Sequence, residues 1–234
     1  MRKNKFYIFA SLLIGSFLLS SCLKDDEYTP IPVAGLTMVN GYVGDNGIIY
    51  YIGQRAVEPL AYKTYTHANI LEGNRSLIIR GLNSPELLID TTVSIEDSTY
   101  YSSFAFGTNG NPKHFIVKDK VIETELANDK VGVRFFNASE VDGQVSLQIG
   151  DQALEPTFQN RAVDNQTSAT EHQDFLAHGS GTFTLTIKDG SGAVLATREA
   201  VKLDASGYYS IVLLGSPADD SKPLYIGVIG QAVN

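Results

Sequence analysis

Four histidines and a single cysteine have the widest choice of chemistry in this chain. His172 and His178 lie six residues apart, with Glu171 and Asp174 beside them. Imidazole and carboxylate groups at such short spacing are ligands for a divalent cation. His67, however, occupies nearly the same place in an earlier, similar stretch, which favours a loop feature of the fold over a metal site. We therefore expect no metal and no cofactor.

Nucleophilic catalysis has little support in the sequence. No Gly-x-Ser-x-Gly motif occurs, and Cys22 is the only cysteine, so it has no partner for an internal disulfide. The glycine-rich stretches 179–181 and 190–192 border predicted strands instead of opening a helix, which indicates turns and not phosphate-binding loops. A pair of glycosidase carboxylates depends on separation in space, and the sequence singles none out. We expect a protein that is not an enzyme.

The residues before Cys22 have the three parts of an export signal. Basic residues at positions 2, 3 and 5 precede an apolar run over 6–19, which is shorter than the roughly 20 residues of a membrane-spanning helix. The ending Leu19-Ser20-Ser21-Cys22 resembles the lipobox of bacterial lipoproteins, which implies cleavage before Cys22 and its acylation with palmitate-like chains. An ordinary signal peptide is the alternative. We expect residues 1–21 to be removed and Cys22 to hold the protein stably at the outer membrane.

A charged run follows the cysteine closely, and it consists of Lys24, Asp25, Asp26 and Glu27. It resembles the export signal of surface lipoproteins in the Bacteroides group, which implies a position on the cell surface. A solvated acidic linker is the alternative. Pro30 and Pro32 disfavour helix in the residues before them, so we expect residues 22–33 to form an extended tether.

The composition limits the class of partner. The 234 residues include 18 basic and 26 acidic side chains, with a formal net charge of −8. Nucleic acid and anionic lipid headgroups both need a basic footprint, so neither is expected as a ligand. Tyrosine, phenylalanine and glycine are plentiful, tryptophan is absent, and helical periodicity is lacking beyond the export signal, which favours an all-β fold.

Two stretches of the chain are alike. Shifted by 97 residues, positions 35–59 align with 132–156 without a gap. The identical pairs are Gly35/Gly132, Asn40/Asn137, Asp45/Asp142, Ile52/Ile149, Gly53/Gly150, Ala56/Ala153, Glu58/Glu155 and Pro59/Pro156. From Leu77 and Leu185 onward the shift is 108, so the second stretch carries 11 extra residues. This pattern predicts a tandem repeat.

Each stretch has the marks of a β-sandwich. Val145 to Ile149 and Thr182 to Lys188 alternate apolar with polar residues, as half-buried strands do. The turn residues at 45–47 and 142–143 predict tight hairpins. We expect two tandem immunoglobulin-like antiparallel β-sandwich domains, 34–118 and 131–234, joined by a linker at 119–130. Tyr208 is expected in the core, with a tyrosine corner as the alternative.

Residues 133–139, Val-Arg-Phe-Phe-Asn-Ala-Ser, are followed by a turn, the strand at 145–150 and a Gly-led strand at 181–188. This succession resembles the opening of the family called domain of unknown function 4397. The first stretch matches more loosely, with Thr37 where the second has Arg134. The resemblance implies a bacterial envelope protein, often with tandem copies and without an established activity. It carries over no catalytic residue.

One candidate contact surface lies on the first stretch. Ile49, Tyr51 and Ile78 point away from the core by alternation, whereas the second stretch has Ser146, Gln148 and Thr186 in their places. An apolar outer face predicts a contact surface. Packing against the second domain or a loop is the alternative.

The extra residues of the second stretch form a candidate recognition loop, with polar residues Asn160, Arg161, Asp164, Asn165 and His172. Long loops on rigid sandwiches often carry recognition, although unstructured filler is the alternative. We therefore expect a non-catalytic surface lipoprotein that acts as an adhesion, glycan-binding or envelope-assembly module. A structural envelope or pilus-like subunit that binds another protein chain is the alternative function.

Overall fold

The computed structural model describes residues 31–84, 86–122, 126, 128–152 and 154–231. Cys22, the charged run at 24–27 and the predicted signal peptide lie outside the described residues. Pro32–Asn234 forms one compact unit. Among the described residues no helix is long and apolar enough to cross a membrane.

The first half of this unit consists of two sheets. Its strands are β1 (Val33–Tyr42), β2 (Gly47–Ile52), β3 (Arg55–Ala56), β4 (Leu60–Ala61), β5 (Tyr65–Leu71), β6 (Gly73–Gly81), β7 (Leu87–Ile95), β8 (Tyr100–Thr108) and β9 (Asn111–Lys118). Sheet A has the order β5-β1-β8-β9, and sheet B has the order β3-β2-β6-β7 with β4 also paired to β2.

The second half repeats this plan with two more sheets. Its elements are β10 (Lys130–Ser139), β11 (Val145–Ile149), the 3-10 helix η2 (Pro156–Phe158), α2 (Gln166–Glu171), β12 (Leu176–Gly179), β13 (Gly181–Asp189), β14 (Val194–Leu203), β15 (Tyr208–Gly215) and β16 (Tyr225–Gly230). Sheet C has the order β12-β10-β15-β16, and sheet D the order β11-β13-β14.

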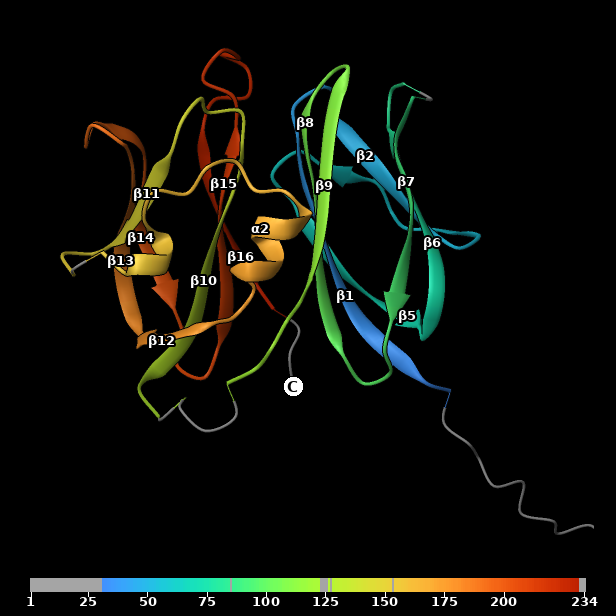
Figure 1. The fold of residues 1–234 in the computed structure, drawn as a ribbon, viewed down its shortest axis with the longest axis horizontal. Coiled ribbons are helices and arrows are strands. Elements are labelled where there is room, and N and C mark those ends of the chain that lie inside the picture. Colours follow the sequence, from blue (N-terminus) through green and yellow to red (C-terminus); the bar gives the residue numbers. More distant parts are fainter. Residues whose placement is uncertain (1–30, 85, 123–125, 127, 153, 232–234) are drawn as a thin grey trace, which may run out of the picture. The chain divides into compact units, whose positions relative to one another are not determined.

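The all-β sandwich class is confirmed, because nearly all regular structure is strand and each half stacks two sheets (Figure 1). The immunoglobulin-like refinement stays a prediction. Among the described strands, the expected antiparallel pairing holds with one exception in each half: β1 runs parallel to β8, and β10 runs parallel to β15. Both exceptions join strands far apart in sequence, which local alternation does not reveal.

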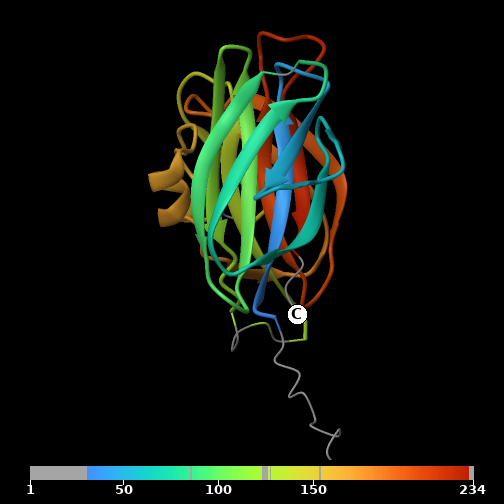
Figure 2. The ribbon, with the colours of Figure 1, turned by 90° about the vertical axis from the view of Figure 1, so that its right-hand side faces the viewer.

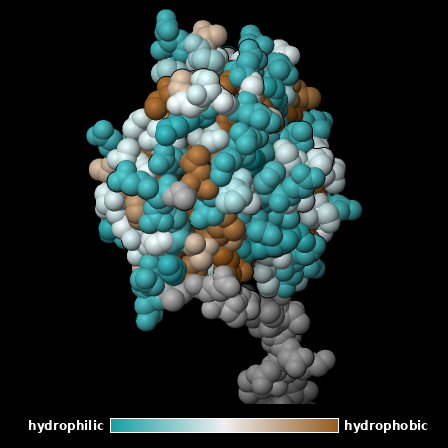
Figure 3. All heavy atoms as spheres, turned by 60° about the vertical axis from the view of Figure 1, so that its left-hand side comes forward, coloured by the Kyte–Doolittle hydropathy of each residue, from teal (hydrophilic) through white to brown (hydrophobic). Residues whose placement is uncertain are grey.

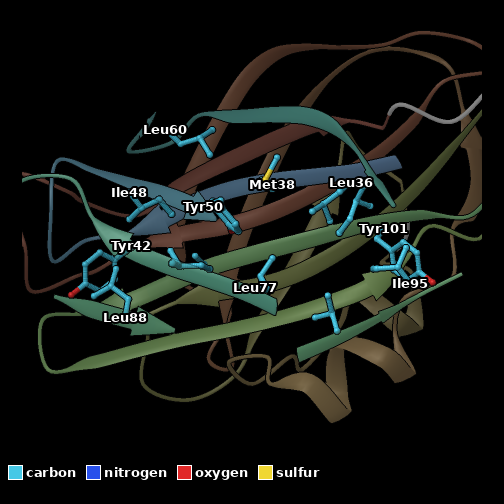
Figure 4. Packing of buried hydrophobic residues seen from close by; sticks show 14 of the residues in the cluster. Leu36, Met38, Tyr42, Ile48, Tyr50, Leu60, Leu77, Leu88, Ile95 and Tyr101 are labelled. Atoms are coloured by element: carbon cyan, nitrogen blue, oxygen red, sulfur yellow. The ribbon is translucent and has the colours of Figure 1, made fainter. Parts of the chain in front are cut away.

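Alternation explains each sandwich core. Leu36, Met38, Ile48, Tyr50 and Leu77 fill the space between sheets A and B, as Figure 4 shows. In the second half β11 alternates between buried and half-exposed residues, as its sequence predicted. Its apolar side chains join a separate core between sheets C and D.

The turn at 45–47 is not a tight hairpin. It carries the chain from β1 in sheet A to β2 in sheet B, and these two strands are not paired. The Asp45 carboxylate accepts hydrogen bonds from the backbone N–H groups of Asn46 at 2.6 Å and Asn83 at 3.0 Å. The aspartate thus ties a corner between sheets to the turn after β6. The turn at 142–143 likewise leads from sheet C to sheet D.

Sheets A and C pack face to face, so the two halves form four layers in the order B, A, C, D (Figures 1 and 2). The contact is apolar and aromatic, with Phe104, Phe106 and Phe115 from sheet A and Phe136, Val212 and Leu214 from sheet C. β1 and β10 are therefore buried on both faces.

The same contact between a glycine and a tyrosine occurs once in each half. Gly35 lies opposite Tyr100, and Gly132 lies opposite Tyr208. A Cβ atom on Gly132 would stand 2.4 Å from the ring of Tyr208, and one on Gly35 would stand 2.5 Å from the ring of Tyr100. These glycines let a tyrosine ring lie directly over the neighbouring strand.

Tyr208 is buried, and its hydroxyl also bonds the backbone N–H and C=O of Ile122 in the linker, at 2.9 and 3.0 Å. The hydrogen bond expected of a tyrosine corner is made by Tyr209 instead of Tyr208. The Tyr209 hydroxyl accepts from the backbone N–H of Asp204 at 3.3 Å. Tyr101 accepts from Glu96 in the same way at 3.0 Å.

Candidate functional site

The histidines near the extra residues are engaged with their own backbone. His172 Nδ1 lies 2.7 Å from the carbonyl of Ser168, and His178 Nδ1 lies 2.8 Å from that of Gly179. No cluster of three or more His, Cys, Asp or Glu side chains arranged for a metal ion occurs in the part of the chain that the structure describes.

Two residues of the candidate recognition loop lie inside the protein. Arg161 and Asp164 are 5% and 2% exposed, and one guanidinium nitrogen donates to both carboxylate oxygens at 2.7 and 2.8 Å. Asp164 also accepts from the backbone N–H of Asn137 in β10 at 2.8 Å. These two side chains fasten the loop to sheet C and are not free to bind a ligand, contrary to the expectation for an exposed loop.

The rest of the loop is ordered as well. The Asn165 side chain accepts from the backbone N–H groups of Thr167 and Ser168, which begins α2 as a helix N-cap. Asn160 is exposed, with a positive φ of 52°, and His172 is half-exposed. Only Asn160, Asn165 and His172, of the five predicted loop residues, keep access to solvent.

The helix of this loop covers an open edge of the first half. Gln166 receives a hydrogen bond from the backbone N–H of Ile116 at 3.0 Å and donates to its carbonyl at 2.8 Å. Gln173 accepts from the N–H of Lys118 at 3.1 Å. Both amides replace the neighbour that edge strand β9 lacks. The polar character of Gln166 was visible in the sequence, but its contact with β9 was not, because nothing local marks a contact 50 residues away.

A groove of about 630 Å³ lies where α2 meets the first half, and we call it the α2 groove. It is bordered by β7, β9 and the start of the linker. Its lining is rich in hydroxyl, amide and ammonium groups, from Thr91, Thr92, Ser94, Tyr101, His114, Lys118, Lys120, Gln166, Thr170 and Gln173. Such groups donate and accept hydrogen bonds in many directions.

The charge of the groove comes from its lysines. Lys118 pairs with Glu96 at 2.6 Å, and Lys120 pairs with Asp174 at 3.3 Å. His114 lies 2.8 Å from the Ser103 hydroxyl, and burial lowers its pKa to about 4. The imidazole is therefore neutral at pH 7.

The candidate contact surface lies on the outer face of sheet B. Tyr51 stands directly opposite Ile78, and Ile49 opposite Arg80. All three apolar side chains are half-exposed. Because sheet A, not sheet B, packs on the second half, that half does not cover this surface.

The outer positions of the second half are different. A shallow surface over β11 and β13 is lined by polar residues that include Gln148, Thr184 and Lys188. Figure 3, which brings this half forward, shows mostly hydrophilic residues and a narrow apolar strip. The outer faces of sheets B and D therefore offer different chemistry.

The described part of the chain is thus an all-β double sandwich with a polar groove at the junction. A family model described as "Domain of unknown function (DUF4397)" matches residues 34–148. The match supports the resemblance to this family over the first sandwich and as far as β11, including the first stretch, where the sequence resemblance was looser.

More distant likenesses were also found. No curated protein matches the chain. CBMbc (family CBM26) from Eubacterium rectale Amy13K, solved with maltoheptaose, has 12% identity and a TM-score of 0.25, over 82% of this chain and 96% of that one. A DUF3823 family protein from Bacteroides ovatus has 15% identity and a TM-score of 0.23, over 75% of this chain and 100% of that one. Both likenesses are too distant to inform function.

Proposed function

We propose that this protein is a non-catalytic binding module at the cell surface and that its α2 groove binds a segment of a glycan. The observation that carries the proposal is the lining of the groove. Hydroxyl, amide and ammonium groups converge there from both halves, around a volume of about 630 Å³. That volume lies within the range of about 300–1,000 Å³ of small-molecule sites.

Sugars present closely spaced hydroxyl groups that both donate and accept. The hydroxyl groups of Thr91, Thr92 and Ser94 match this pattern, and Lys118 and Lys120 supply donors. The groove offers no exposed aromatic platform, since Tyr101 is 4% exposed. Recognition therefore rests on hydrogen bonds, and we expect modest affinity that depends on the pattern of hydroxyls.

The test is calorimetric titration with a panel of host, dietary and envelope glycans. Ser94→Trp fills the groove and should weaken binding by at least about ten-fold. The matched control is Thr197→Trp on exposed β14, which should leave affinity unchanged. Equal affinity of the groove variant and the native protein, or no binding by any glycan, would remove the proposal.

The anchor belongs to the same proposal. Its support is the lipobox-like Leu19-Ser20-Ser21-Cys22 and the charged run that follows. Cys22→Ser should abolish labelling with radioactive palmitate and release the protein from membranes. Replacing the three acidic residues Asp25, Asp26 and Glu27 with alanine should protect the protein from protease added to intact cells. Unchanged cleavage by the added protease would show that the charged run at 24–27 is only a linker.

Two tandem copies of one domain form the architectural part of the proposal. The contacts Gly35–Tyr100 and Gly132–Tyr208 support it, because they recur in the same register. Separate expression of residues 131–234 tests whether the second copy folds by itself.

The alternative function is assembly with another protein chain through Ile49, Tyr51 and Ile78. The observation in its favour is that Tyr51 and Ile78 form a half-exposed cross-strand pair on the face turned away from the second half. Tyr51→Ser should then remove the crosslinked product that this protein forms with its partner chain on cells. An unchanged crosslinking pattern would contradict assembly through this face.

A further inference from the structure

Strand β5 is an uncovered edge of sheet A. It spans seven residues, Tyr65–Leu71, pairs with β1 on one side, and has no strand on its other side among the described residues. It contains no lysine, glutamate or proline, the residues that usually protect an edge from pairing with another chain. The opposite edge of the same sheet, β9, is covered by Gln166 and Gln173.

An apolar groove of about 470 Å³ opens beside this edge, between β5 and the β2–β3 turn. We call it the β5 groove. Its apolar lining consists of Ile52, Val57, Ala68, Ile70 and Leu71. Leu71, at the end of β5, is 48% exposed and continues this apolar lining to the surface.

In the second half, the position equivalent to the β5 groove is almost completely filled. Ile149 and Gln152 stand where the first half has Ile52 and Arg55, yet the cavity there is only about 10 Å³. It is lined by Phe158 and His178. His178 is the equivalent of Ile70: it pairs with Val131 in sheet C, as Ile70 pairs with Ala34 in sheet A.

Phe158 comes from a stretch that the first half lacks. Pro59 aligns with Pro156, while Leu60 and Arg161 occupy the same pairing position beside β2 and β11. Thr157 to Asn160 are therefore extra. Phe158 therefore lines this position in the second half, whereas the β5 groove of the first half has no equivalent aromatic side chain.

Two arginines stand at the rim of the β5 groove. Arg55 is exposed. Arg75 donates to the backbone carbonyl of Leu71 at 3.0 Å and to that of Glu72, which holds its guanidinium at the end of β5. In a chain with a net charge of −8, this pair marks a local site for a carboxylate.

We propose that an extended segment of a partner polypeptide pairs with β5 as an added strand. It inserts an apolar side chain into the β5 groove and sets a carboxylate against Arg55 and Arg75. The free backbone edge accounts for the extended conformation, the groove for the apolar residue, and the arginines for the acidic one. Specificity comes from alternate side chains and affinity from main-chain hydrogen bonds.

The experiment uses four labelled eight-residue peptides and fluorescence polarisation with the protein from residue 32 onward, the compact unit. The first peptide alternates threonine with leucine and ends in two glutamates. The second ends in two lysines, the third carries N-methyl groups on alternate amides, and the fourth has serine in place of leucine. The first should bind at least about ten-fold more tightly than the other three.

Variants locate the site. Arg55→Glu combined with Arg75→Glu should reverse the preference between the acidic and basic peptides, and Leu71→Ser should weaken the acidic peptide. The control Arg198→Glu lies on β14 in the other half and should leave the preference unchanged. Hydrogen exchange with the acidic peptide should slow the amides of residues 65–71.

Several results would overturn the inference. They are equal binding of the N-methylated peptide, no binding of any peptide up to about 1 mM, and protection that maps to the α2 groove. Protection of residues 65–71 without peptide, together with a dimer in sedimentation, would make the occupant a second copy of this chain. Glycan binding at the α2 groove is measured separately, so either proposal can fail without the other.

Discussion

Arg134 of β10 donates a hydrogen bond to Asp119, the residue that follows β9, and each side chain is 1% exposed. Burial raises the pKa of Asp119 and lowers that of Arg134, while each charge opposes the shift of the other. The guanidinium carbon also lies 4.3 Å from the ring centroid of Phe175. An ion pair thus joins the two halves, and its guanidinium carbon lies 5.1 Å from the ring centroid of Phe136 in the apolar interface.

Hydroxyl and amide groups complete this network. Ser102 donates to Asp119 at 3.0 Å, and Arg134 donates to Ser210 at 2.8 Å. Gln231 Oε1 lies 2.9 Å from the Ser102 hydroxyl oxygen, and the Gln231 side-chain amide donates to Ser210 at 2.7 Å. Ser102 and Ser210 hold equivalent places in β8 and β15, opposite Thr37 and Arg134.

The first prediction concerns this pair. Arg134→Met should lower the free energy of unfolding by about 3–5 kcal/mol, because it leaves the Asp119 carboxylate buried without its cation. Adding Asp119→Leu should recover much of that loss, since the uncompensated charge is then gone. Urea unfolding of the native protein, both single variants and the double variant measures the coupling. Additive losses would show that the two side chains do not act as a pair.

The second prediction concerns pH. The unfolded chain protonates His114 below its ordinary pKa of about 6.5, whereas the folded protein does so only near pH 4. The unfolded state therefore binds more protons between these values, and stability falls as the pH drops through this window. His114→Gln should reduce the loss between about pH 7 and 4.5 by roughly 1–3 kcal/mol. An identical pH dependence in the variant would contradict the burial of this imidazole.

The third prediction concerns the glycine beneath a tyrosine. Gly132→Ala should destabilise the protein by about 2 kcal/mol or more, because the new methyl group meets the Tyr208 ring at 2.4 Å. Gly190→Ala is the matched control, since nothing lies within 4 Å of its Cβ position. Thermal unfolding of both variants gives the comparison. Equal effects would mean that the ring moves aside freely.

The fourth prediction concerns the covered edge of β9. Replacing Gln166 and Gln173 with alanine removes the acceptors of the Ile116 and Lys118 amides. Hydrogen exchange at these two amides should become at least about ten-fold faster. Amides of β15, which is central in sheet C, serve as the internal control. Unchanged protection at Ile116 would show that the helix backbone, and not the glutamine side chains, shields the edge.

Much of the fold followed from local pattern. The alternation of Val145 to Ile149 predicted which side chains face a core, because one face of that strand meets water. It could not predict that β1 pairs with β8, since pairing over such a separation leaves no local trace. The runs at 104–106 in sheet A and 211–214 in sheet C are apolar without alternation. Such runs indicate strands that are buried on both faces, so the sequence did contain a sign that sheets A and C are covered on both sides.

The candidate site was predicted less well. Polar composition marked Arg161 and Asp164 as available for recognition, yet a buried ion pair uses the same residue types as an exposed loop. The outward direction of Ile49, Tyr51 and Ile78 did follow from alternation, and the structure places them on one face. The two grooves were not foreseen, because each is formed by segments brought together only in the folded chain.

Strand β1 begins at Val33 and is hydrogen-bonded along both edges, to β5 and to β8. Any tension applied at the N-terminal end of the described chain therefore enters through a central strand. A pull along its axis loads many hydrogen bonds at once, and they must yield together instead of opening one after another.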